Sequence, residues 1–344
     1  MRKGNAMKKK GRRLKLADVA AHCNVSISTA SRALSGTPGV RADLRERILA
    51  TARELNYQQP STLAGQRIVV LASARAMVDY QRNQFTTHVL YGIKAQAKLL
   101  DMELEMQSAP DRQSELALLK EAEASKEVAG LLFLAVDDEV VLAQARTLAK
   151  PIVLVNGDDP LMQLSSVAPH NRAAAAAATQ YLVDLGHQRI LFCTNPGRRT
   201  IERRREGWLE SLPVEVQADR DDLIVEVEEW TPEAARAGIA ARLDRGDDFT
   251  AVLCAGDSLA IGVVLELRAR GLRVPQDVSV VGIDGLPQGE FLAPALTSVH
   301  VPMNSIGQAA VNLMREHVLD ESFIARRVEL ACELVVRSSS GLKS

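Results

Sequence analysis

The chain has 344 residues, which is too long for one ordinary domain core and predicts two or three domains. Its hydrophobic content of 47% and charged content of 25% are typical of a globular protein and exclude wholesale disorder. The net charge of −1 conceals an asymmetry, since residues 1–60 contain 13 Lys and Arg against 4 Asp and Glu. A basic head on an acidic body predicts a polyanionic partner for the head alone, with a solvated basic tail as the alternative.

Features of membrane, exported and metal-binding proteins are lacking in the sequence. No run of 18 apolar residues is present, so no membrane-spanning helix is predicted. The basic segment Met1–Lys15 has no apolar stretch after its charges, unlike a signal peptide, so a cytoplasmic protein is predicted. The spacing of the four cysteines fits neither a metal site nor a disulfide framework, and we expect reduced thiols, no metal and no cofactor: Cys23, Cys193, Cys254 and Cys332.

The head opens with helical periodicity. Apolar residues recur at i, i+3, i+4 and i+7 on one face, at Leu16, Val19, Ala20 and Cys23. Asn24 and Val25 interrupt this pattern, and Asn tolerates the left-handed backbone of a tight turn. Ser26 is a natural N-cap for a second helix, from Ile27 to about Leu34.

A third helix completes the head. Residues 35–39 are a break rich in Gly, Pro and Ser, and the helix then runs from about Arg41 to Leu55. Its apolar stripe consists of Leu44, Ile48, Leu49, Ala52 and Leu55. Two short helices joined by a tight turn and followed by a packing helix predict a helix-turn-helix unit.

The second helix has a surface suited to the major groove of DNA. Its exposed face is predicted to carry Ile27, Ser28, Thr29, Ser31 and Arg32, and Ser26 at its start is a candidate DNA contact as well. Short side chains allow close approach to the groove floor, and Arg32 can reach a phosphate or the O6/N7 edge of guanine. A purely structural bundle is the alternative, although Glu/Lys pairs would be more usual on such a face.

The residues of the head resemble those of a known family. The run from Leu16 to Gly36, and the later run from Val40 to Tyr57, are similar to the head of the LacI/GalR family of bacterial transcription regulators. The resemblance implies that Ile27 and Ser28 read bases, with Arg32 beside them. It also implies a DNA-binding transcription regulator, most often a repressor, whose operator affinity is switched by a small molecule.

Residues 58–67 form the junction between head and body. The family usually has a hinge helix here that pushes a leucine into the minor groove, which makes Leu63 the candidate wedge. The segment is shorter than usual and the familiar Asn and Ala-Arg around the leucine are missing. A plain linker is therefore the open alternative.

The body alternates short apolar runs with helical stretches. The predicted strands are 68–71, 130–134, 152–155, 190–193, 251–254 and 278–283, and the predicted helices are 88–100, 173–185, 233–243 and 259–270. This pattern predicts parallel sheets covered on both faces. Two such α/β halves, the first ending near Asn156–Pro160 and the second spanning Asn171 to Asp284, would enclose a ligand cleft. The chain is expected to recross through Thr297–Val301.

The expected domains follow from these elements and from the resemblance. They are a basic tail (1–13), an all-α helix-turn-helix head (14–57), a hinge or linker (58–67) and an α/β body with two lobes and parallel sheets (68–344). The body resembles the periplasmic-binding-protein-like core of the same family. The resemblance implies that it binds the effector. A homodimer is predicted because a single recognition helix contacts too few base edges for useful specificity.

Candidate effector contacts lie at predicted strand and helix ends. Asp284 ends the strand 278–283, where a carboxylate could accept two hydroxyl hydrogens of a sugar. The resemblance makes Arg204 the effector-binding arginine, with a surface ion pair as the alternative for both residues. It also implies that Trp230 stacks on a sugar or base face, unless it is a core or surface aromatic.

Three further positions belong to the same prediction. Phe85 and Thr86 match the start of the first helix of the body, which faces the cleft in the family. Asp257 opens another helix, where it could equally act as a helix cap.

Two departures from the family pattern bear on the ligand. His170 replaces the usual Asp before Asn171, and Gly256 replaces the usual Asn before Asp257. The imidazole could accept an acidic ligand, although a lone His more often has a structural role. A sugar or a sugar derivative, which includes acidic ones, is expected.

Other classes of function fit the sequence less well. An enzyme is not expected, because the first strand lacks a following G-x-G-x-x-G and no P-loop or G-x-S-x-G is present. A transport binding protein would have a signal peptide and no DNA-binding head. An architectural DNA-binding protein without an effector is the remaining alternative. The predicted partners are a palindromic double-stranded operator, a sugar-like effector and a second copy of the chain, with no membrane.

Overall fold

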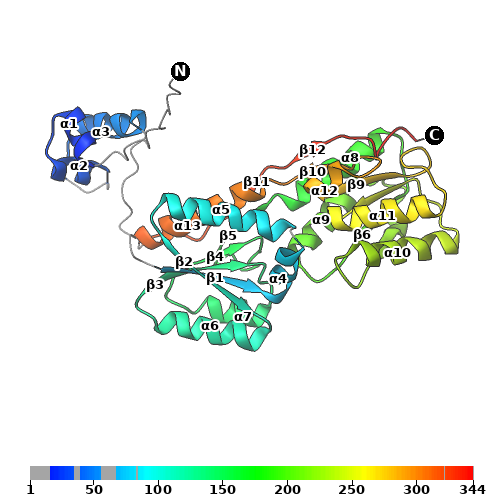
Figure 1. The fold of residues 1–344 in the computed structure, drawn as a ribbon, viewed down its shortest axis with the longest axis horizontal. Helices are drawn as coiled ribbons and strands as arrows, with labels where there is room; N and C mark the ends of the chain where they lie inside the picture. The colour runs from blue at the N-terminus through cyan, green and yellow to red at the C-terminus, as the bar shows by residue number, and fades with distance from the viewer. Residues whose placement is uncertain (1–15, 35–38, 56–66, 83, 321, 344) are drawn as a thin grey trace, which may run out of the picture. The chain divides into compact units, whose positions relative to one another are not determined.

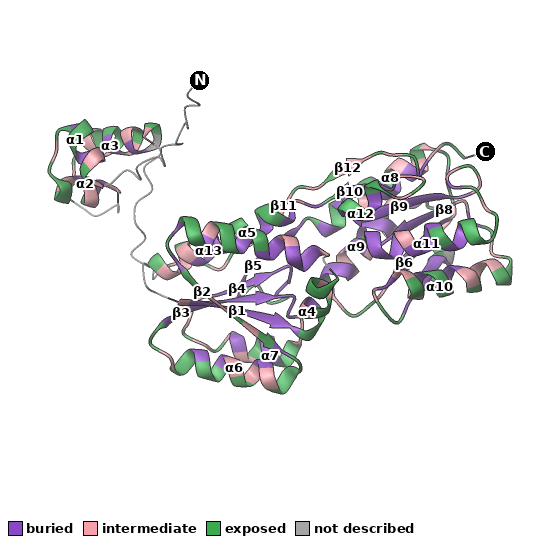
Figure 2. Ribbon diagram, viewed as in Figure 1, coloured by how far each residue is buried: buried purple, intermediate pink, exposed green. Residues whose placement is uncertain are grey.

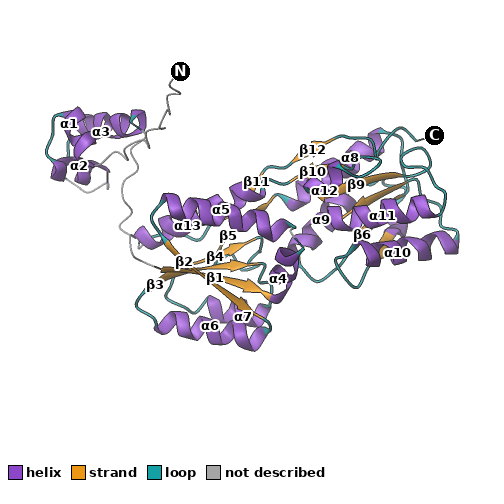
Figure 3. Ribbon diagram, in the orientation of Figure 1, coloured by secondary structure: helices purple, strands orange, loops and turns teal. Residues whose placement is uncertain are grey.

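The computed structural model describes residues 16–34, 39–55, 67–82, 84–320 and 322–343. The chain divides into two compact units, Met1–Ala64 and Gly65–Ser344. Figure 3 shows that the first described unit is helical and that the second combines helices with strands. Among these residues, no helix is long and apolar enough to cross a membrane.

The head consists of the three predicted helices. They are α1 (Leu16–Cys23), α2 (Ile27–Leu34) and α3 (Ala42–Glu54), each of which packs against the other two. The core of the head consists of buried Val19, Cys23, Ala33, Ile48 and Ala52, flanked by partly buried leucines and valines. The predicted helix-turn-helix is therefore confirmed.

The turn between α1 and α2 follows from two residues. Asn24 adopts a left-handed backbone (φ 54°), which lets Val25 N–H donate to Ala20 O at 3.0 Å. Ser26 then caps α2, since its Oγ accepts from Thr29 N–H at 3.1 Å. The turn fixes the angle between α1 and α2.

The first lobe of the body is built on a six-stranded parallel sheet with the order β11-β5-β4-β3-β1-β2 (Figure 1). Its strands are β1 (Arg67–Ser73), β2 (Glu103–Ala109), β3 (Val128–Leu134), β4 (Ile152–Val155), β5 (Ser165–Pro169) and β11 (Arg327–Leu330). Helices α5 (Phe85–Leu99) and α13 (Met303–Leu319) cover one face, and α6 (Arg112–Ala124) and α7 (Glu139–Ala145) cover the other. The short α4 (Ala74–Gln81) follows β1 directly.

The second lobe repeats this plan. Its sheet has the order β12-β10-β9-β8-β6-β7, and only the β12–β10 pairing is antiparallel among the described strands. The strands are β6 (Ile190–Thr194), β7 (Ile224–Glu226), β8 (Ala251–Cys254), β9 (Ser279–Asp284), β10 (Thr297–His300) and β12 (Glu333–Val335). The main helices pack as two pairs, α8 (Asn171–Asp184) with α9 (Arg199–Ser211) and α10 (Pro232–Arg245) with α11 (Asp257–Ala269). A short α12 (Pro287–Glu290) follows β9.

The central strands of both sheets are buried (Figure 2), because residues such as Leu131, Leu154 and Leu253 are covered by helices on both faces. This explains why the continuous apolar runs were sufficient to predict β1, β3, β4, β6, β8 and β9. The two-lobed α/β fold with parallel sheets is confirmed.

The described chain passes between the lobes three times, and the predicted boundaries need correction. The first lobe does not end near Asn156–Pro160, because β5 pairs with β4 and belongs to the first sheet. The crossing follows Pro169. The segment Thr297–His300 lies in the second sheet, so the chain returns to the first lobe only after it, and crosses a last time between β11 and β12.

Candidate DNA-binding helix and ligand cavity

Helix α2 presents the predicted side chains to solvent. Ile27, a large apolar residue, is 54% exposed, and Ser28 and Arg32 are exposed as well. Thr29 and Ser31 are half-buried, while the opposite face buries Ala30 and Ala33 against the other two helices. An exposed apolar side chain among short polar ones suits contact with base edges, which include the thymine methyl group.

Ser26 is exposed but engaged in the structure of the helix. Besides capping Thr29 N–H, its hydroxyl lies 2.9 Å from Ser28 Oγ and 2.8 Å from Thr29 Oγ1. The three hydroxyl groups thus form hydrogen bonds with one another at the amino end of α2. The other predicted DNA contact, Leu63, lies outside the described residues, so the hinge stays a prediction.

A cavity of about 450 Å³ lies between the two lobes of the body. Its walls come from the segments that follow the carboxyl ends of β1, β3 and β4 in the first lobe and of β6, β7 and β9 in the second. Parallel α/β sheets place their ligands at this edge. Five predicted effector contacts line the cavity: Phe85, Thr86, Arg204, Trp230 and Asp284.

Arg204 and Asp284 form a buried ion pair at the cavity wall. Arg204 Nη1 lies 3.1 Å from Asp284 Oδ1, and Arg204 Nε donates to Asn171 Oδ1 at 2.8 Å. Arg204 also donates to the backbone oxygen of Ala255. Burial raises the pKa of Asp284 to about 7, a rise that Arg204 opposes and the neighbouring Asp257 reinforces. Asp284 also adopts a φ of 132°, which is unusual for a residue with a side chain.

The other two predicted effector contacts do not line the cavity. Asp257 is fully buried behind Asp284, where it accepts from Ser298 Oγ at 2.5 Å and from Leu286 N–H at 2.6 Å. It therefore holds the loop after β9, and Gly256 occupies the N-cap position of α11. His170 caps α8, since its Nδ1 accepts from Ala173 N–H at 3.2 Å, and its Nε2 lies 3.6 Å from Glu329.

Several cavity residues were not predicted from the sequence. They include Arg75, Asp79, Arg82, Gln84, Asn156, Asn195, Arg198 and Thr200. Most follow the carboxyl end of a strand or begin a helix, as Arg75 does after β1 and Asn156 after β4. A position directly after a predicted strand or at a helix start was therefore the sequence signal that could have identified these residues.

Polar contacts join the lobes around the cavity. Gln84 Nε2 donates to Ser258 Oγ at 2.6 Å, and Arg82 Nη1 donates to Trp230 O at 3.2 Å. Arg198, at the start of α9, pairs with Asp137 of the first lobe through Nε and Oδ2 at 2.7 Å. The lobes are therefore held together by side chains that border the cavity.

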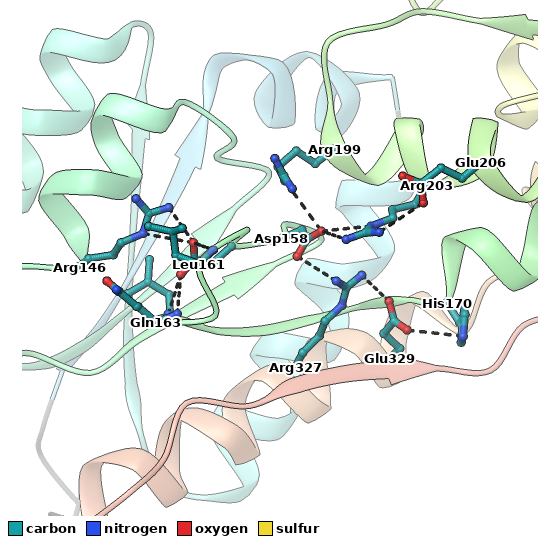
Figure 4. Close-up of polar contacts among 12 residues, drawn as sticks. Arg146, Asp158, Leu161, Gln163, His170, Arg199, Arg203, Glu206, Arg327 and Glu329 are labelled. Atoms are coloured by element: carbon teal, nitrogen blue, oxygen red, sulfur yellow. Dashed lines mark hydrogen bonds and ion pairs between the residues drawn. The ribbon is translucent and has the colours of Figure 1, made fainter.

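A second cluster joins the lobes outside the cavity (Figure 4). The buried carboxylate of Asp158, in the loop after β4, lies 3.2 Å from Arg203 and 3.9 Å from Arg199, both on α9 of the second lobe. It also lies 3.1 Å from Arg327 on β11. One carboxylate of the first lobe thus attracts two arginines that approach from the other lobe.

In the described part of the chain, the thiols and the possible metal ligands form no further site. All four cysteines are free, with Cys23, Cys193 and Cys254 buried and Cys332 half-buried. Among the described residues, no group of His, Cys, Asp and Glu is arranged to hold a metal ion.

Comparisons with known proteins match both units. Residues 15–60 match the family described as bacterial regulatory proteins, lacI family, and residues 179–340 match the periplasmic binding protein-like domain. The HTH-type transcriptional regulator MalR of Streptomyces coelicolor is 32% identical over 337 residues, which cover 95% of this chain and 96% of MalR.

Two solved structures share the fold over nearly the whole chain. The transcriptional regulator CelR in complex with cellobiose is 26% identical with a TM-score of 0.70, covering 95% of this chain and 100% of that one. The lac repressor dimer bound to operator and an anti-inducer is 24% identical with a TM-score of 0.68, covering 96% and 100%.

Proposed function

Because the chain belongs to the LacI family of bacterial regulatory proteins and is a sequence-specific DNA-binding transcription regulator, we propose that it is a repressor whose operator affinity is switched by a sugar-like effector. It is not an enzyme, since the relatives it matches are transcription regulators. The observation that carries the proposal is the cavity between the lobes, with the Arg204–Asp284 pair and Trp230 in its walls.

The composition of the cavity supports a sugar-like ligand. A carboxylate and a guanidinium held in fixed positions can accept from and donate to neighbouring hydroxyls of one ring. Trp230 supplies an aromatic face for the apolar side of the ring. The similar CelR structure contains cellobiose, a sugar, which agrees with this composition.

The switch follows from the position of the cavity. A ligand that contacts both lobes stabilises their closed arrangement by its differential affinity for that arrangement. Contacts such as Gln84–Ser258 and Arg198–Asp137 would be strengthened or exchanged in the same event. The change reaches the DNA through residues 58–67, where Leu63 is the candidate minor-groove wedge.

A homodimer is part of the proposal. One α2 helix contacts too few base edges for useful specificity, whereas two copies would read the two halves of a palindromic operator. The similar lac repressor structure is a dimer on its operator. Analytical ultracentrifugation at micromolar concentration should give the mass of two chains, and a monomer at that concentration would contradict this part. Operator binding would place the protein at the nucleoid, in the cytoplasm.

The effector-independent architectural protein remains the alternative function. Such a protein has no need of a buried Arg204–Asp284 pair beside an open cavity, and burying two charges is costly unless their geometry serves a purpose.

The test begins by selecting an operator from random-sequence DNA with the full-length chain. Neutral sugars, sugar acids and sugar phosphates are then titrated into the operator complex. One class should change operator affinity by about 5- to 150-fold, the usual range of allosteric coupling. The response should be lost in Trp230→Ala, Asp284→Ala and Arg204→Ala, and kept in Arg172→Ala, whose exposed side chain pairs with Glu210 away from the cavity.

Two results would contradict the proposal. If no class changes operator affinity, the switch is wrong. If Asp284→Ala and Arg204→Ala both keep the full response, the effector binds elsewhere.

A further inference from the structure

One end of the cavity is lined by an arginine from each lobe, Arg75 and Arg198. Arg75, in the first turn of α4, lines the cavity and forms no hydrogen bond or salt bridge with the described residues. Burial lowers the pKa of Arg75 and the nearby guanidinium of Arg198 lowers it further, whereas the nearby carboxylate of Asp137 raises it. The two guanidinium groups, which belong to opposite lobes, are therefore close enough to repel one another.

The acidic side chains of the cavity have other partners or lie at its rim. Asp284 pairs with Arg204, and Asp79 Oδ2 accepts from Thr86 N–H at 2.5 Å. Asp137, which pairs with Arg198 and also attracts Arg75, lies outside the cavity lining. Glu228 and Glu229 are exposed. The guanidinium N–H groups of Arg75, which make no hydrogen bond among the described residues, can therefore donate to a ligand in the cavity.

Two buried polar atoms at the cavity have no partner. Asn156 is 8% exposed and Thr200 is 3% exposed, and both line the cavity. Asn156 Oδ1 and Thr200 Oγ1 have no hydrogen-bond partner among the described residues. Buried polar atoms are rarely left unpaired, so a ligand that bonds to them would remove a cost of desolvation. The Thr200 hydroxyl can donate to an anion, and the Asn156 amide can bond to an adjoining hydroxyl.

The amino end of α9 also favours a negatively charged ligand in this part of the cavity. Arg198 is the N-cap residue of this 13-residue helix, and no side chain caps its first turn. Unpaired amide groups and the helix dipole favour negative charge at such an end. Arg198 and Thr200 therefore bring to the cavity both the guanidinium and the start of the helix.

We propose that the effector is an acidic sugar whose carboxylate or phosphate group binds between Arg75 and Arg198. Its ring then lies toward Trp230 and the Arg204–Asp284 pair, and its acidic group also meets Thr200. This inference rests on the proposed function and narrows the chemical class of its ligand. Two guanidinium forks from opposite lobes would bind the anion only when the lobes are closed, which makes the acidic group the part of the ligand that drives closure.

The first experiment uses inorganic phosphate and acetate as probes of the full-length protein, with chloride at equal ionic strength as the reference. Thermal stability should rise saturably with phosphate or acetate in the wild type. Arg75→Gln should weaken this binding about 10-fold or more, as the loss of a charge-assisted hydrogen bond predicts. Arg75 makes no hydrogen bond or ion pair within the described residues, so this variant should fold normally. Arg75→Lys should restore part of the effect.

Matched controls separate this site from other arginines. Arg273→Gln removes an exposed arginine whose partner is Asp277, and should leave the response unchanged. No stabilisation by either anion in the wild type, or the same stabilisation in Arg75→Gln, would overturn the inference.

The second experiment compares glucose, glucuronate and glucose 6-phosphate in the same assay. Tighter binding of glucuronate than of glucose, sensitive to Arg75→Gln, identifies a carboxylate, and the same result for glucose 6-phosphate identifies a phosphate. A neutral sugar that switches operator binding equally well in wild type and Arg75→Gln would overturn the inference and leave the proposed function standing. Anion binding at Arg75 with no effect of any ligand on operator affinity would overturn the proposed function alone.

Discussion

The pKa of a buried charged group in this protein depends on its burial and on the charges around it. Glu115, in the first turn of α6, is only 7% exposed. Burial raises its pKa to about 7, and the nearby carboxylates of Asp138 and Asp111 contribute in the same direction. The folded protein therefore holds a proton on Glu115 between about pH 4.5 and 7, whereas the unfolded chain releases it.

This difference makes stability depend on pH. Because the folded state binds the extra proton, the contribution of Glu115 is most favourable below pH 4.5, falls as pH rises to about 7 and is constant above. Glu115→Gln removes the charge and should raise the melting temperature at pH 8 while changing little at pH 4.5. Glu121→Gln, at an exposed site on the same helix, should show no such difference. Equal effects of Glu115→Gln at the two pH values would contradict the explanation.

At the scale of elements, helices α2 and α9 show how small side chains allow one helix to pack closely against another. In α2 the buried face consists of alanines, which bring the helix close to its neighbours and leave the larger residues outside. In α9 Gly207 lies against the backbone oxygen of Arg172 on α8, so that the two helices are in close contact. Both helices are positioned by small residues on the side that packs.

The exposed face of α2 can be tested through Arg32. Arg32→Ala should weaken binding to the selected operator by about 1–3 kcal/mol, or roughly 5- to 150-fold, and reduce the preference for operator over random DNA. Arg41→Ala removes the same charge outside α2 and should affect both DNAs alike. Unchanged affinity and preference in Arg32→Ala would rule out this face as the reader of the sequence.

The close contact of α8 with α9 predicts a cost for any side chain at Gly207. A Cβ atom there would collide with the backbone oxygen of Arg172, which cannot rotate away. Gly207→Ala should therefore destabilise the body by about 1–3 kcal/mol, seen as a lower melting temperature. Gly238→Ala in α10 is the matched control, because its Cβ would meet only the side chains of Val225 and Val227. A smaller loss for Gly207→Ala than for Gly238→Ala would refute this account.

At the scale of the whole molecule, the two lobes are held together by ionic contacts as well as by the three crossings of the chain. Asp158 is central among these contacts, since it belongs to the first lobe and forms ion pairs with Arg199 and Arg203 of the second. It does not line the cavity. Its removal would therefore alter the relation of the lobes without altering the ligand contacts.

Asp158→Ala should favour separated lobes by about 1–3 kcal/mol, less than for a fully buried pair because Arg199 and Arg203 are partly exposed. Small-angle X-ray scattering should then show a larger radius of gyration. Asp277→Ala breaks a pair that lies within one lobe and should leave the radius unchanged. Identical scattering of Asp158→Ala and the wild type would show that the cluster does not hold the lobes.

The parts that were predictable from the sequence are those whose signal is local. The helices of the head and strands such as Ile152–Val155 could be predicted because periodicity or a continuous apolar run identifies them. The strand Glu103–Ala109 was missed because it lies at the sheet edge, where polar residues are tolerated. Of the cavity residues, Arg75 and Arg198 were missed because their meeting depends on how the two lobes face one another. His170 was assigned to the ligand, although its position before Asn171 also fits the helix cap that it forms.

The three crossings also determine the order in which parts of the protein can fold during synthesis. The head is complete once residue 55 has left the ribosome, whereas the first lobe requires α13 and β11, and the second requires β12, near the end of the chain. Since domains generally fold as units during translation, the DNA-binding helices are formed long before either lobe can close its sheet. A nascent or truncated chain would thus have a folded head with no completed ligand site to control it.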